Sequence, residues 1–209
     1  MADRLNRLLG SGGVALVLTE VQEGIVGEAA PWPHLRDAAE EVGLVANAAR
    51  LARAAREADA PVIHCTAEHF PGNFGGNRNA LLFASANKLR AGKTDRDPLL
   101  DAPHPAIWQD GDIKLPRYHA LSAMSGSPLD SMLRNQGIDT LVIGGVSISF
   151  GVLSLVMDAV NRSYRVILPR DAVAGFPRDY ARQVMDNTLA MLATIAATDE
   201  IVAAWRPAA

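Results

Sequence analysis

Residues 13–19 (GVALVLT) form a short run of apolar side chains that no charged residue interrupts. Such a run is typical of a strand that is buried on both faces of a parallel sheet. Similar runs recur at Val62–Thr66, Leu141–Gly145 and Arg165–Leu168. Because parallel strands need crossover connections that cover the sheet, we expect layers of helices around a central sheet.

The segments between these runs have the apolar spacing of amphipathic helices. We predict helices over Leu35–Ala58, over Val152–Arg162 and from about Pro177 to Ala197. Strands that alternate with helices indicate right-handed βαβ units. The predicted fold class is therefore α/β, a three-layer α/β/α architecture with a mostly parallel, doubly wound central sheet.

The length of 209 residues suits one substantial core and is too short for two ordinary domains with a linker. We therefore expect a single domain over residues 1–209. The apolar fraction of 49% and the charged fraction of 21% argue against a disordered or membrane-spanning chain. Residues 70–105 are irregular apart from a helix expected within Ala80–Lys88, and they contain the polar cluster Gly92–Asp97. Loops of this length in compact domains are usually functional.

Charge and cysteine content limit the partners and the compartment. The net charge of −3 and the sequence pI near 5.9 argue against nucleic-acid binding, which depends on clustered Lys and Arg. The single cysteine, Cys65, cannot form an internal disulfide, and residues 1–13 lack the layout of a secretion signal, so we expect a cytoplasmic protein. Inside the second apolar run, Cys65 is interpreted as a small buried residue and not as a nucleophile.

The C-terminal stretch has more apolar residues than one helix face requires. They are Met185, Leu189, Met191, Leu192 and Ile195. Part of such a surface can be buried against another subunit, which predicts a homo-oligomer.

Ligands of open parallel sheets bind beyond the carboxyl ends of the strands, so polar residues there are the first candidates for chemistry. These candidates are Glu20 and Gln22 after the first strand, Glu68 and His69 after the second, Lys114 beside a short strand, and Ser147–Gly151 after the strand at 141–145. The histidines at 64, 69, 104 and 119 form no HxH or HxxxH pair. We therefore predict no metal and no cofactor.

Each candidate also has a purely structural interpretation. A carboxylate such as Glu20 that follows a buried strand is a functional acid or base, or else a helix cap or a surface ion-pair partner. Strand alternation places Lys114 on the same side as Asp112, where it is a catalytic lysine or a member of a surface ion pair. The turn Gly145–Gly151 can direct backbone N–H groups at an anion, or it simply joins a strand to a helix.

Taken in chain order, these segments resemble the isochorismatase-like, or cysteine hydrolase, family. Ala15–Gln22 resembles the family's apolar strand that ends in Asp-x-Gln, and Asp112–Lys114 with Arg117–Ala120 resembles its catalytic-lysine segment. Pro128–Arg134 and Gly137–Val146 resemble the helix and the strand that lead to the nucleophile, and the match extends over Asp158–Ala159, Tyr164–Val166 and Asp171–Ala172. The resemblance covers most of the chain.

The resemblance implies a catalytic group with two departures from the family pattern. Glu20 stands at the position of the family's aspartate, Lys114 at that of its lysine, and Gly151 at that of its nucleophilic cysteine. The substrate contacts that we expect around them are Gln22, Glu68, His69, Arg78, Arg117, His119, Ser147 and Phe150.

Without a thiolate, the covalent route of the family's amidases has no nucleophile at its usual place. Isochorismatases instead cleave a vinyl ether, for which a neutral carboxyl group is a suitable proton donor. The leading hypothesis is a cysteine-independent hydrolase of a small anionic metabolite, with Glu20 as acid or base and Lys114 as its electrostatic partner. The alternatives are an inactive family member that binds a small ligand or serves in an assembly, and an amide hydrolase that uses Ser147 or Ser149.

Overall fold

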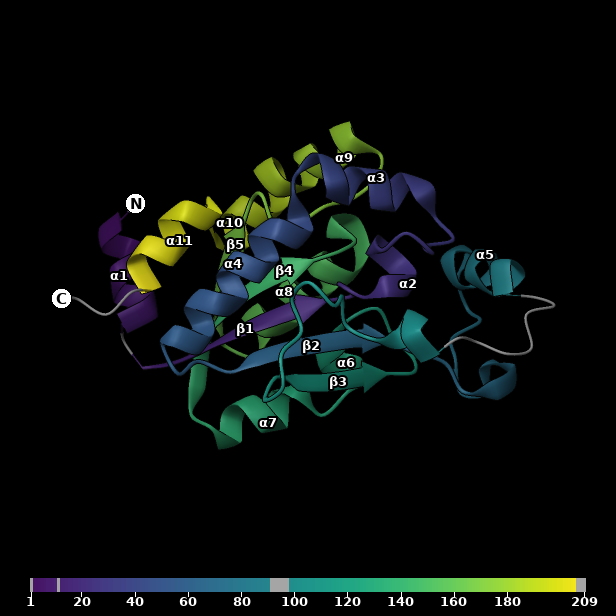
Figure 1. Ribbon diagram of the computed structural model, residues 1–209, viewed down its shortest axis with the longest axis horizontal. Coiled ribbons are helices and arrows are strands. Elements are labelled where there is room, and N and C mark those ends of the chain that lie inside the picture. Colours follow the sequence, from purple (N-terminus) through teal and green to yellow (C-terminus); the bar gives the residue numbers. More distant parts are fainter. Residues whose placement is uncertain (1, 11, 91–97, 206–209) are drawn as a thin grey trace.

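The computed structural model describes residues 2–10, 12–90 and 98–205, which fold around one six-stranded sheet (Figure 1). Its strands are β1 (Gly13–Thr19), β2 (Val62–Ala67), β3 (Ile113–Arg117), β4 (Ile138–Gly145), β5 (Arg165–Pro169) and β6 (Thr194–Ala196). They lie in the order β3-β2-β1-β4-β5-β6, and all neighbours are parallel. The strand order reverses between β1 and β4, which is where open α/β sheets bind ligands.

The apolar run of β1 is continuous because both of its faces are buried. Leu16 and Leu18 belong to the core cluster on one side of the sheet, whereas Ala15 and Val17 belong to the cluster on the other side. All four side chains are at most 1% exposed. Helices on both faces complete three layers, so the predicted α/β/α fold class is confirmed.

Two groups of helices form the outer layers. The first packs against the face of Leu16 and comprises α1 (Ala2–Gly10), α2 (Glu23–Val26), α3 (Pro33–Glu41), α4 (Leu44–Glu57) and α11 (Thr198–Trp205); α4 crosses in front of the sheet in Figure 1. The second packs against the face of Val17 and comprises α6 (Ala123–Gly126), α7 (Leu129–Asn135), α8 (Leu153–Asn161) and the turn η4 (Val184–Leu189).

Three short elements lie in the long connection between β2 and β3. They are η1 (Pro71–Asn73), α5 (Leu81–Arg90) and η2 (Pro98–Asp101). The helix expected within Ala80–Lys88 is thus present as α5, which projects beyond the carboxyl ends of the strands (Figure 1). The polar cluster Gly92–Asp97 lies outside the described residues.

Two of the predicted helices are wrong in their extent. The helix expected over Leu35–Ala58 is divided into α3 and α4 by Gly43, whose φ of 66° is left-handed. The helix expected from Pro177 to Ala197 consists of α9 (Arg178–Gln183), η4 and α10 (Ala190–Leu192), and the chain then extends into β6 beside β5. Pairing with a distant strand decides that end, and apolar spacing alone does not reveal it.

The apolar C-terminal residues that suggested an oligomer are largely used inside the chain. Met185 and Leu189 are buried in the core, and Leu192 and Ile195 pack against it, whereas Met191 is 82% exposed. The homo-oligomer therefore remains a prediction. Among the described residues, no helix combines the length and the apolar character needed to cross a membrane.

Candidate functional site

The ends of β1 and β4 lie against each other at the point where the strand order reverses. Gly145 pairs with Thr19 and has a φ of 118°, and a side chain at this position would collide with the backbone of Thr19. Directly afterwards, Val146 donates a backbone hydrogen bond to the carbonyl of Thr19 at 3.0 Å. Glycine therefore permits the close approach that brings η3 (Ile148–Val152) to the end of β1.

Glu20 leaves β1 in an unusual backbone conformation. Its φ is 58°, and its N–H donates to the carbonyl of Cys65 at 2.8 Å. Left-handed conformations are uncommon for residues with long side chains and cluster at functional sites. The conformation keeps the side chain 17% exposed, and its Oε1 accepts a hydrogen bond from Arg117.

Arg117, at the end of β3, is the cation that contacts Glu20. Its side chain is 9% exposed. Nη2 bonds to Glu20 Oε1, and Nη1 donates to the carbonyl of Ala120 at 2.7 Å. Ala120 is itself left-handed, with a φ of 67°, and donates its N–H to Asn77 Oδ1 at 2.7 Å. The guanidinium is therefore fixed between two backbone-constrained residues, and charge-assisted bonds of this kind are strong.

Gly151 lies in η3 beside the same carboxylate. A Cβ atom on Gly151 would stand 3.1 Å from Glu20 Oε1 and 3.1 Å from the carbonyl oxygen of Val146. Glu20, Arg117 and Gly151 thus meet at one place, although they come from three different strand ends.

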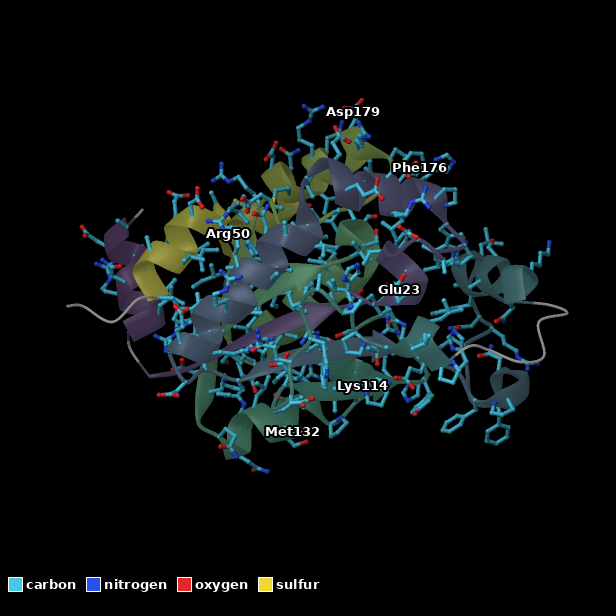
Figure 2. The ribbon with its side chains drawn as sticks, viewed as in Figure 1. Glu23, Arg50, Lys114, Met132, Phe176 and Asp179 are labelled. Atoms are coloured by element: carbon cyan, nitrogen blue, oxygen red, sulfur yellow. The ribbon has the colours of Figure 1, made fainter. Side chains whose placement is uncertain are left out.

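Lys114 does not contact Glu20. Its Nζ forms an ion pair with Glu68 Oε1 at 2.8 Å, and the hydroxyl of Thr66 donates to the same oxygen at 2.8 Å. Alternation along β3 explains the difference, because Leu115 faces the cluster around α8 and Arg117 shares that face, whereas Lys114 points to the other one. Figure 2 labels Lys114 on β3, which is an edge strand of the sheet. Glu20 is thus paired with Arg117 and not with Lys114, and the catalytic role expected of Lys114 stays a prediction.

Asp112 is not paired with Lys114 either. Its Oδ2 lies 2.6 Å from Arg56 Nη2 and 2.9 Å from His64 Nε2. Burial lowers the pKa of His64, although its hydrogen bond with Asp112 opposes that shift. Burial raises the pKa of Asp112, but hydrogen bonds from Arg56 and His64 outweigh it and hold the pKa below its usual value. This buried cluster, which the sequence did not reveal, joins α4 to β2 and β3.

Gln22 positions backbone and is fully buried. Its Oε1 accepts from the N–H of Ala67 at 2.7 Å, while Nε2 donates to the carbonyls of Ala67 at 3.2 Å and Leu100 at 3.1 Å. Gln22 thus bridges the ends of β1 and β2 and the element η2, and the substrate contact expected of it stays a prediction.

A family model for the isochorismatase domain matches residues 14–200 of the chain. The chain belongs to the isochorismatase family. The phenazine biosynthesis protein PhzD1 of Pseudomonas aeruginosa is 33% identical over 163 residues, which cover 77% of this chain and 74% of PhzD1. The resemblance found in the sequence is thereby confirmed at the level of the hydrolase family.

Solved isochorismatase-family structures share the fold. A family protein from Burkholderia thailandensis superposes with a TM-score of 0.74 at 26% identity, covering 92% of this chain and 95% of its own. The N-carbamoylsarcosine amidase of Thermoplasma acidophilum superposes with a TM-score of 0.68 at 25% identity, covering 90% and 98%.

The other expected contacts of this isochorismatase-family site differ in exposure. Glu68 and Ser147 are half-buried, as is His69, whereas Arg78, His119 and Phe150 are exposed. The hydroxyl oxygens of Ser147 and Ser149 lie 3.2 Å apart, and in the described part of the chain neither is hydrogen-bonded to a histidine. A serine activated by a neighbouring base is therefore not assembled.

Cys65 lies on β2 beside this group of charges and is 1% exposed. Burial raises the pKa of its thiol to about 12, a shift that the Arg117 charge reduces and the Glu20 charge increases. Such a thiol remains protonated and unreactive, as expected for a small buried residue. Within residues 2–10, 12–90 and 98–205, no group of three or more His, Cys, Asp or Glu side chains is arranged to hold a metal.

Proposed function

We propose that this isochorismatase-family member is a cysteine-independent hydrolase of a small anionic metabolite, with Glu20 as the proton-transferring group and Arg117 as its electrostatic partner. The observation that carries the proposal is the position of Glu20 Oε1, which stands 3.1 Å from the place where a side chain at position 151 would begin. A carboxylate oxygen therefore lies beside the position at which the family resemblance implies a cysteine.

The proposed reaction is the hydrolysis of a vinyl ether. Protonated Glu20 donates its proton to the terminal carbon of the vinyl group, and water adds to the resulting oxygen-stabilised cation. The water proton returns to Glu20, and the hemiketal breaks into a carbonyl compound and an alcohol. Arg117 stabilises the Glu20 carboxylate that the first step creates, which lowers the energy of the charge-separated transition state.

An anionic substrate is supported by the charge of Arg117. The guanidinium of Arg117 would attract a carboxylate of the substrate. The Nε of Arg117 is buried and lacks a hydrogen-bond partner among the residues that the structure describes.

A second candidate is an inactive family member that binds a small ligand. The closed ion pair between Glu20 and Arg117 favours it, because the carboxylate already has a partner. The serine alternative has less support, since Ser147 and Ser149 are bonded to each other.

Turnover of a panel of vinyl ethers and amides distinguishes these candidates. We expect vinyl-ether hydrolysis by the natural protein and a loss of about 10²-fold or more in Glu20→Gln, which keeps the shape and removes the acid. Arg165→Met is the matched control and should leave kcat within about threefold, because Arg165 is the first residue of β5 and lies at the opposite edge of the parallel sheet from Glu20. Full activity in Glu20→Gln would contradict the proposal. Binding of an anionic ligand without any turnover would favour the inactive member.

A further inference from the structure

We propose that Glu20 and Gly151 are an interdependent pair, in which the carboxylate of Glu20 occupies the space that a side chain at position 151 would need. Gly151, in η3, then leaves the space in which the acid is positioned. The inference deepens the proposed function, but the spatial relationship itself does not depend on any turnover.

The first support is the crowding around Gly151. A Cβ atom there would stand 3.1 Å from Glu20 Oε1 on one side and 3.1 Å from the carbonyl oxygen of Val146 on the other. The backbone of Val146 is buried and donates its N–H to the carbonyl of Thr19 at 3.0 Å, so it has little freedom to move. An added Cβ atom is therefore accommodated most easily by a small shift of the Glu20 carboxylate, which is the end of a side chain and not part of the backbone.

The second support is that Glu20 is held in place. Its backbone N–H bonds to Cys65, and its carboxylate bonds to Arg117. Arg117 is anchored on Ala120, and its aliphatic part packs against Gly126, where a Cβ atom would lie only 3.1 Å from Arg117 Cβ. A shift of the Glu20 carboxylate away from position 151 therefore disturbs a largely buried ion pair.

The length of the acidic side chain at position 20 couples this position to position 151. Aspartate is one methylene shorter, so its carboxylate would not extend as far toward η3 from the same backbone. Two combinations fit this space: glutamate at position 20 with glycine at position 151, and aspartate at position 20 with a larger residue at position 151. Glutamate at position 20 together with a side chain at position 151 overfills it. Because interiors are closely packed, such crowding destabilises the fold.

Thermal unfolding of a double-mutant cycle tests the steric coupling. Gly151→Ala should lower Tm by about 4 °C in the natural background and by a similar amount with Glu20→Gln, which keeps the length of the side chain. With Glu20→Asp the same change should cost less than half as much, because the space has been opened. An equal decrease in Tm in all three backgrounds would contradict the proposed coupling of positions 20 and 151. Folding of Gly151→Ala only in combination with Glu20→Asp would support it.

A thiol at position 151 tests the proximity of the charge. In Gly151→Cys, the pH dependence of alkylation by iodoacetamide should give an apparent thiol pKa about one unit or more higher than in Gly151→Cys with Glu20→Gln, because the carboxylate opposes the thiolate. The natural protein is the control for the background from Cys65, which is 1% exposed.

The two measurements also separate this inference from the proposed function. Neither measurement uses turnover. If the protein is inactive but shows coupled Tm values and a shifted alkylation profile, the inference about Glu20 and Gly151 stands and only the proposed hydrolase activity is contradicted. Additive Tm values with identical alkylation profiles would overturn the pair even in an active hydrolase.

Discussion

The guanidinium of Arg117, at the end of β3, reaches past β2 and bonds to the carboxylate of Glu20 at the end of β1. Both side chains are mostly withdrawn from water, with 9% and 17% of their surfaces exposed. Removal of one partner therefore leaves a poorly solvated charge without compensation, which costs more than the net contribution of the intact pair.

We expect Arg117→Met to lower the free energy of unfolding by roughly 3 kcal/mol, because it leaves the Glu20 carboxylate buried and unpaired. Urea denaturation measures this change. The matched control is Arg182→Met, which removes the exposed partner of Asp179 and should cost less than about 1 kcal/mol. Equal losses in the two variants would show that the Arg117 pair behaves as a surface pair.

Gln22→Leu should destabilise the chain by about 3 kcal/mol, because it leaves the N–H and carbonyl of Ala67 and the carbonyl of Leu100 without their partner. Thermal unfolding followed by circular dichroism measures the loss. Gln136→Leu is a suitable control, since Gln136 is exposed at the end of α7. A small and similar shift in both variants would argue against the bridging role of Gln22.

Stability should fall as the pH decreases below about 6.5, the ordinary value for histidine. Burial lowers the pKa of His64 in the folded chain. Just below pH 6.5 the histidine is therefore protonated more readily in the unfolded chain than in the folded chain, so a decrease in pH favours unfolding. The pKa of Asp112 is also lowered, which adds a second loss of stability below about pH 4.

The dependence of Tm on pH in the natural protein and in His64→Asn checks this expectation. The variant lacks the titrating imidazole, so its Tm should change less between pH 7 and pH 5. The absolute Tm of the variant is not the readout, because the substitution also alters packing against Trp108, which contacts His64 edge-on. Identical slopes for the two proteins would exclude His64 as the source.

Several features of the fold and the site could be predicted because they depend on local patterns. The apolar run at residues 13–19 requires burial on both faces, and this alone indicates a parallel sheet between helices. The family pattern then predicted the position of Glu20 after β1 and of Gly151 after β4. The edge strand β6 could not be recognised, because its three residues become a strand only through pairing with β5.

The sequence by itself determined which residues stand at the strand ends, including a carboxylate at position 20 and a glycine at position 151. Only the tertiary structure decided which cation meets that carboxylate, since Lys114 and Arg117 are three residues apart on one strand and face opposite sides of the sheet. The physical reason is that a contact depends on the face to which a side chain points and on what packs there. Strand pairing therefore places Glu20 beside Arg117 and Gly151, whereas Lys114 forms its ion pair with Glu68.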